Sequence, residues 1–102
     1  MTRDVSVALL VRIEAIPGRE QDVADFLRQG LSLVQQEPET VRWFGIRFGP
    51  SSFGVFDAFP DESGRQAHLN GKVAQALQKN TGTLFEQPTI EQIEVLVENG
   101  PE

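Results

Sequence analysis

The sequence has no cysteine, one histidine and one tryptophan among its 102 residues. Without cysteine, disulfides, thiolate metal sites and a cysteine nucleophile are excluded. A single histidine excludes any site that needs two imidazoles from one chain. Basic residues are few, with 9 Lys and Arg against 15 Asp and Glu and a net charge of −6. Because binding to a phosphate backbone needs a basic surface, we expect no nucleic-acid partner.

Long apolar runs are also missing. No segment approaches the ~18 consecutive apolar residues of a membrane span, so no membrane partner is expected. The start, Met1–Asp4, lacks the basic-then-apolar layout of a signal peptide. The composition, 39% hydrophobic and 24% charged, is that of an ordinary globular domain. We therefore expect one cytoplasmic domain over residues 1–102, with a core at 5–97 and a frayed tail at 99–102.

What the sequence does contain is a regular pattern of apolar residues near its start. Every second residue from Val5 to Ile13 is apolar, which predicts a strand that stops at Pro17-Gly18. Residues 19–36 then predict a helix, because apolar side chains recur at spacings of three and four. Its buried stripe would comprise Val23, Phe26, Leu27, Leu31 and Val34.

Two central segments, Thr40–Phe48 and Ser52–Phe59, are predicted strands with apolar residues on both faces. Side chains alternate between the faces of a strand, so a half-exposed strand would show polar residues at every second position. A second helix is expected to run to about Lys79, capped by Asp61 or Ser63. Its apolar stripe would comprise Leu69, Val73, Ala76 and Leu77, although Asn70-Gly71 inside it is usually a turn signal.

With a last strand at Ile90–Val97, the predicted order is β-α-β-β-α-β. This is the ferredoxin-like α+β arrangement, in which a four-stranded antiparallel sheet carries two helices on one face. The other face would then be bare, although the central strands are apolar on both sides. We expect a second copy of the chain to cover it, in an obligate homodimer that buries ~2,000 Å² or more.

Several segments resemble the antibiotic biosynthesis monooxygenase family of dimeric α/β barrels. They are WFGIRF from Trp43, FGVFDAFPDESGRQAHLNGKVAQAL from Phe53, the earlier Pro17-Gly18-Arg19-Glu20 and the final Ile90–Val97. The resemblance spans roughly Val5 to Val97 and implies a homodimer with a pocket in each subunit, between the sheet and its own helices. It also implies oxidation of a phenol, quinol or anthrone without a cofactor, in which an apolar cavity promotes deprotonation and the anion reacts directly with dioxygen.

No metal, haem or flavin is expected. Haem-degrading members of the superfamily use an Asn, a Trp and an iron-ligating His. By alignment, Val11 stands where the Asn would be, His68 at roughly the Trp position, and Gln78 near the position of the iron ligand. None of the three matches, so the resemblance argues against haem.

His68 is the first candidate catalytic residue, because only its side chain titrates near neutral pH without a strong shift. It is similar to a helix-two histidine of quinol-oxidising relatives. It lies off the apolar stripe of its helix, however, so a surface or interface position is the alternative. Asp57 is the second candidate, and a buried carboxylate in an apolar strand needs a partner. Pairing with Arg65, Arg47 or His68 is open at this point, and the His68 pair would raise the basicity of the imidazole.

Four residues are candidates for substrate binding. Trp43 and Phe56 could stack on an aromatic substrate, although strand aromatics are more often core or interface residues. Arg65 and Arg47 could bind a carboxylate or phenolate, or form ion pairs instead. The alternative function is a non-catalytic barrel that binds a small ligand or acts under stress. An apolar pocket of ~300 Å³ or more with His68 at its wall favours the enzyme, and a filled core favours the alternative.

Overall fold

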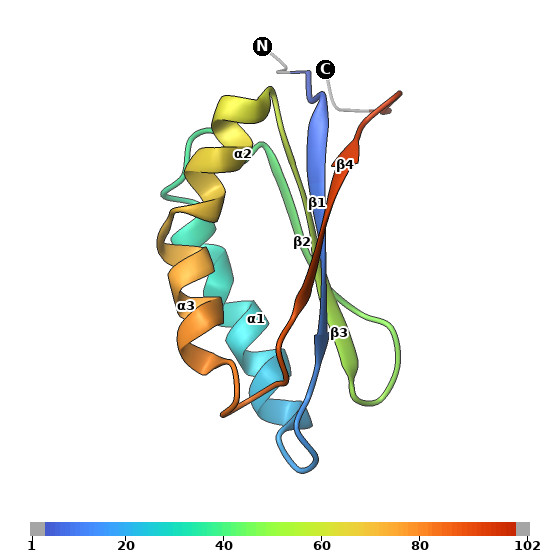
Figure 1. The fold of residues 1–102 in the computed structure, drawn as a ribbon, viewed down its shortest axis with the longest axis vertical. Coiled ribbons are helices and arrows are strands. Elements are labelled where there is room, and N and C mark those ends of the chain that lie inside the picture. The colour runs from blue at the N-terminus through green and yellow to red at the C-terminus, as the bar shows by residue number, and fades with distance from the viewer. Residues whose placement is uncertain (1–3, 100–102) are drawn as a thin grey trace.

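The computed structural model describes residues 4–99, so most of the tail predicted at 99–102 lies outside the described residues. Its elements are β1 (Val7–Glu14), α1 (Glu20–Val34), β2 (Arg42–Arg47), β3 (Ser52–Phe59), α2 (Glu62–Leu69), α3 (Lys72–Asn80) and β4 (Thr89–Glu94). Figure 1 shows two layers, with the helices together on one side of a twisted sheet. The predicted ferredoxin-like α+β fold is confirmed.

The sheet has the strand order β2-β3-β1-β4, and every neighbouring pair is antiparallel. Leu9 on β1 pairs with Asp57 on β3, which in turn pairs with Trp43 on β2. Because side chains alternate along a strand, these three side chains share one face of the sheet. The register therefore places both Asp57 and Trp43 on the face that the helices cover.

The core lies between that face and the helices. Phe59, Phe85, Leu9, Ile13 and Val23 are its largest fully buried apolar side chains. The stripe predicted for α1 is buried at Val23, Leu27 and Val34. Leu31, which was expected in the stripe, is 48% exposed and borders a hollow beside the edge strand β2.

The prediction of one continuous second helix is wrong. The helical segment divides at Asn70 and Gly71, where the Asn70 backbone N–H still bonds to Gln66 but Gly71 is extended. Asp61 caps α2 as predicted, since its carboxylate accepts a hydrogen bond from the Gly64 N–H at 2.9 Å. Because the break resets the helical phase, the face that α2 buries comprises Gly64, Arg65 and His68.

No described helix covers the opposite face of the sheet (Figure 1). By the register, its central apolar side chains are Leu10, Phe44, Ile46, Phe56 and Ile93. The rings of Phe44 and Phe56 stack with their centroids 6.4 Å apart, and Phe44 is 50% exposed. We call this surface the open face. Within residues 4–99, no helix is long and apolar enough to cross a membrane.

Candidate active site

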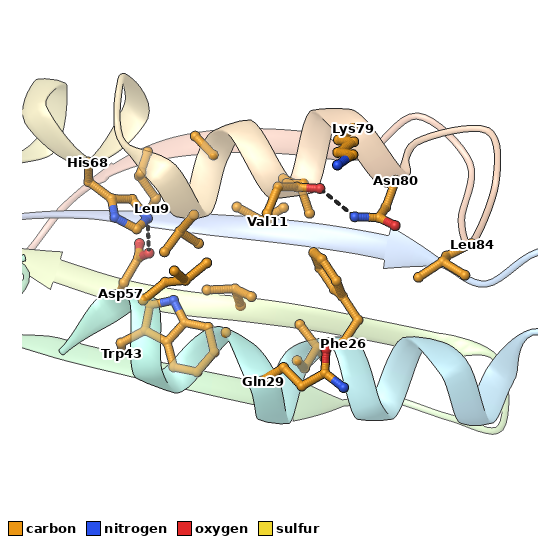
Figure 2. A pocket seen from close by; sticks show the side chains of 18 of the residues that line it. Leu9, Val11, Phe26, Gln29, Trp43, Asp57, His68, Lys79, Asn80 and Leu84 are labelled. Atoms are coloured by element: carbon orange, nitrogen blue, oxygen red, sulfur yellow. Dashed lines mark hydrogen bonds and ion pairs between the residues drawn. The ribbon is translucent and has the colours of Figure 1, made fainter. Parts of the chain in front are cut away.

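A cavity of about 670 Å³ lies between the sheet and the helices. Strand residues such as Leu9, Val11 and Val55 form its floor, and α1, α2 and α3 supply its walls. Figure 2 shows His68, Asp57 and Trp43 at one end, and Gln29, Lys79, Asn80 and Leu84 toward the other. The cavity is therefore apolar along its length and polar at both ends.

Asp57 lies at the end of the cavity that His68 and Trp43 also line, which we call the inner end. It lies in the middle of β3 and its side chain has no solvent exposure. Its partner is His68, whose Nε2 atom lies 2.9 Å from Asp57 Oδ2 (Figure 2). At this distance the contact is an ion pair, and among residues 4–99 neither carboxylate oxygen has a hydrogen-bond donor of good geometry. Of the three pairings left open by the sequence, the structure selects the one with His68.

His68 lies in the last turn of α2 and is only 7% exposed. The surface position offered as its alternative is therefore excluded in this subunit. Its ring packs against the buried Phe59 ring with the centroids 5.3 Å apart. On the side away from Asp57, its Nδ1 atom lies 2.5 Å from Glu37 Oε1. Both ring nitrogens thus contact carboxylates.

Glu37 is the site residue that the sequence analysis missed. It follows the C-terminal end of α1, and its Oε1 atom also accepts a hydrogen bond from Thr40 Oγ1 at 2.9 Å. Gly71 allows the close approach of this loop, because a Cβ atom at that position would lie 2.9 Å from Glu37 Oε2. In the sequence, Glu37 stands out only as the residue before Pro38, which signals a helix end.

The three ionisable groups shift one another's pKa values. Burial raises the pKa of Asp57, the charge on Glu37 adds to the rise, and His68 acts in the opposite direction. Burial acts to lower the pKa of His68, but the close contacts with the Asp57 and Glu37 carboxylates and their charges outweigh it, so this pKa is raised. Because each ring nitrogen faces an acceptor, the surroundings favour the doubly protonated imidazolium.

Arg65 does not line the cavity, as a substrate-binding residue would have to do. It is 8% exposed, and its Nη1 atom donates to the carbonyl oxygens of Ala8 at 3.1 Å and Ile93 at 3.2 Å. Its guanidinium also pairs with Glu62, the residue one turn earlier. The alternative pairing of Arg65 with Asp57 is not formed, because Arg65 fastens α2 to the backbone of the sheet and does not line the cavity.

Arg47 and Phe56 lie away from the Asp57–His68 pair. Arg47 is exposed and places its guanidinium 4.6 Å from the ring centroid of Phe53, a cation–π contact. The alternative pairing of Arg47 with Asp57 is therefore wrong. Phe56 belongs to the open face, where it stacks on Phe44. Of the six predicted site residues, the structure brings three together at the cavity, namely Trp43, Asp57 and His68.

The opposite end of the cavity carries several charged and amide side chains, and the sequence analysis had not singled them out. They are Arg19, Asp22, Asp25, Gln29, Lys79 and Asn80. Arg19 and Asp22 form an ion pair at 3.2 Å. Across the described part of the chain, no group of three or more His, Asp and Glu side chains is arranged to hold a metal ion. The expectation that no cofactor is needed stays a prediction.

Comparison with solved structures places the fold among known proteins. A protein from Deinococcus radiodurans named "putative antibiotic biosynthesis monooxygenase" has a TM-score of 0.78 at 14% identity, covering 94% of this chain and 98% of that one. One of the same name from Nitrosomonas europaea has a TM-score of 0.78 at 13% identity, covering 89% of this chain and 99% of that one. The fold is that of the antibiotic biosynthesis monooxygenase proteins.

A second protein from Nitrosomonas europaea, the NE2512 protein of unknown function, is far more similar. Its crystal structure has a TM-score of 0.95 at 51% identity, and the match covers 99% of each chain. The chain belongs to the same family as NE2512. No family model and no curated protein matches the sequence.

Proposed function

We propose that the protein is a monooxygenase without metal or flavin that oxidises a phenolic, quinol or anthrone-type small molecule with dioxygen. One observation carries this proposal: an apolar cavity of about 670 Å³ has the buried Asp57–His68 pair at its wall. A filled core would have favoured a non-catalytic barrel. The cavity is instead within the range of ~300–1,000 Å³ that small-molecule sites occupy.

The site offers what such a reaction needs from a protein. The Asp57–His68 pair is a proton acceptor in a cavity whose walls are mostly apolar, and the low polarity strengthens its interactions. Loss of a proton makes the substrate an electron-rich anion that can transfer an electron to dioxygen. For an anthrone, the CH₂ carbon becomes a carbonyl that contains one oxygen atom, and the other leaves as water with the two hydrogens.

The fold neighbours named as monooxygenases support the proposed reaction class. A neighbour from Bacteroides thetaiotaomicron, described as a possible oxidoreductase, supports it in the same way. At 12–14% identity these likenesses concern the fold alone. The reaction class therefore depends on the cavity and its residues.

We further propose that the protein works as a cytoplasmic homodimer whose sheets pack against each other through the open face. This surface exposes half of Phe44 and half of Phe48, and it has an apolar centre that no helix of residues 4–99 covers. Apolar patches of this kind on a sheet mark an interaction surface. A second copy would present the same patch, as a two-fold symmetric interface requires.

Oxygen uptake tests the proposed reaction. The protein is incubated with a panel of dihydroquinones and anthrones, and uptake is compared with that of heat-denatured protein and of a His68→Ala variant. We expect uptake equimolar with product for at least one compound, unchanged after treatment with a chelator. Tight binding of panel members without any uptake would instead favour the non-catalytic small-ligand barrel.

A further inference from the structure

Two buried polar groups at the inner end of the cavity have no hydrogen-bond partner among residues 4–99. One is the fully buried carboxylate of Asp57, whose Oδ1 has no partner and whose Oδ2 has only the ion-pair contact with His68. The other is Nε1 of Trp43, a donor that is also shielded from solvent. A buried polar group that is left unpaired destabilises the folded protein. Two such groups, one acceptor and one donor, both on residues that line one cavity, indicate a ligand that satisfies them.

The two residues are neighbours. Trp43 and Asp57 are cross-strand partners on β2 and β3, and both project toward the helices. Cross-strand side chains of this kind start ~4.5–5.5 Å apart, and Figure 2 shows the indole nitrogen on the edge of the Trp43 ring that faces Asp57. The Trp43 ring is also fixed in place, because its six-membered ring lies over Gly30 of α1 and Gly45 of β2, where Cβ atoms would lie within 3.6 Å of it.

His68 does not compete for this ligand atom. Its Nε2 atom faces Asp57 and its Nδ1 atom faces Glu37, so neither nitrogen is left over for a third partner. The imidazolium instead offsets the negative charge of Asp57 and holds the carboxylate in position. His68 is therefore a positioning residue, and Glu37 in turn holds His68.

We propose that the cavity binds a flat aromatic ligand through a ring hydroxyl. This hydroxyl donates a hydrogen bond to the Asp57 carboxylate and accepts one from Trp43 Nε1. This proposal rests on the proposed function and names the atoms that would receive the substrate. The apolar stretch beyond this end, formed by residues such as Leu27, Val55 and Leu77, would cover the rest of the ring system.

Binding of two matched probes tests the proposal without any turnover. The probes are 2-naphthol, which both donates and accepts a hydrogen bond, and 2-methoxynaphthalene, which can only accept one. Dissociation constants are measured by calorimetry under nitrogen, so the result does not depend on oxygen chemistry. We expect the wild type to prefer 2-naphthol by about 10- to 100-fold, which corresponds to the cost of an unpaired buried acceptor.

The variants separate the two contacts. Asp57→Leu should reduce the preference for 2-naphthol to less than about threefold, because it removes the acceptor. Trp43→Phe should weaken both probes by a similar factor and keep the preference, because both probes accept from the indole. Gln87→Ala, at an exposed residue that does not line the cavity, should change neither value. If Asp57→Leu does not fold, Asp57→Asn should lower the preference to roughly its square root, since charge-assisted hydrogen bonds are about twice as strong as neutral ones.

Three outcomes would overturn the proposal. They are equal binding of both probes by the wild type, a preference that persists in Asp57→Leu, and no binding of 2-naphthol at about 1 mM. Oxygen uptake with equal probe binding would leave the monooxygenase in place and remove the hydroxyl contact. If the wild type prefers 2-naphthol as expected but no panel compound causes oxygen uptake, the hydroxyl contact stands and the monooxygenase proposal fails.

Discussion

The two faces of the sheet are built from the same strands but differ in what they do with apolar side chains. On the helix side, Leu9, Val11 and Val55 surround a cavity with a buried carboxylate at one end. On the open side, Phe44 and Phe56 stack on each other in partial contact with solvent. The helix-covered face encloses a cavity, and the open face leaves its aromatic side chains partly exposed.

This difference shows that apolar residues on the two faces of one strand can serve different purposes. In β3, Val55 and Asp57 face the helices, while the neighbouring Phe56 faces outward. A charged group is retained only where neighbours can compensate it, as His68 does for Asp57. The chemistry therefore belongs to the enclosed face and the proposed assembly to the open one, and the following changes separate them.

The largest expected effect is on catalysis. His68→Ala should lower kcat by up to about 10²–10⁴, the usual contribution of a general base, because Asp57, the proposed proton acceptor, loses the charge that positions it. Initial rates of oxygen uptake with a confirmed substrate measure this. His68→Gln serves as a companion that fills the same space. A folded His68→Ala protein with a rate within about threefold of the wild type would remove His68 from the mechanism.

Truncation of the same residue type on the two faces should differ sharply in stability. Phe59→Ala should lower the free energy of unfolding by about 3–5 kcal/mol, because Phe59 is completely buried beneath His68. Phe44→Ala, at a position 50% exposed in one subunit, should cost less. Its cost should also grow with protein concentration if the open face is an interface. Urea unfolding at two protein concentrations makes the comparison, and equal, concentration-independent losses would contradict the assignment of the faces.

A charge on the open face should affect assembly alone. Phe56→Asp would place a carboxylate at the centre of the proposed interface, so we expect the dimer to dissociate at least about tenfold more readily. Sedimentation velocity measures the change, and Gln29→Ala on the far side of the molecule is the control. A wild type that sediments as a folded monomer at micromolar concentration would refute the homodimer itself.

The smallest expected effect is on the pH dependence of stability. The pKa of His68 in the folded protein is raised above its ordinary value of 6.5, so the folded state holds this proton more tightly than the unfolded state. The resulting stabilisation is complete below pH 6.5 and is lost as the pH rises through the raised pKa. This loss of a proton is a titration of the coupled Asp57–His68 pair as a whole, and not of His68 alone. Its slope cannot exceed about 1.4 kcal/mol per pH unit for one proton.

Denaturant midpoints measured from pH 6 to pH 9 on the wild type and on His68→Gln test this dependence. The wild type should lose stability with rising pH more steeply than the variant. Parallel curves would show that His68 holds no additional proton in the folded state.

Much of the fold could be predicted from the sequence, because it depends on local periodicity. The strand predicted at Ser52–Phe59 has the same bounds in the structure. The apolar stripe predicted after it does line the cavity, although its residues belong to two helices and not to one; they are Leu69, Val73, Ala76 and Leu77. Once the helix is broken at Gly71, a residue that a continuous helix would turn outward can face the sheet, as His68 does.

The site could be predicted only in part. Asp57 and His68 were recognisable by their chemistry, as an acid in an apolar strand and a lone histidine. Glu37 was not, because its role depends on a tertiary contact across 31 positions of sequence. The position of Arg65 could not be predicted either, because its partners include backbone carbonyl oxygens, which every residue carries.

Trp43 gives the protein an optical property that follows from its place in the cavity. The chain has one tryptophan and no tyrosine, so near-ultraviolet emission excited at long wavelength comes from this single indole. Because the ring lines the cavity, any molecule that enters will alter the intensity or colour of that emission. The protein therefore carries an intrinsic fluorescent reporter at its own candidate active site, and compound libraries can be screened for ligands without labels and before any substrate is known.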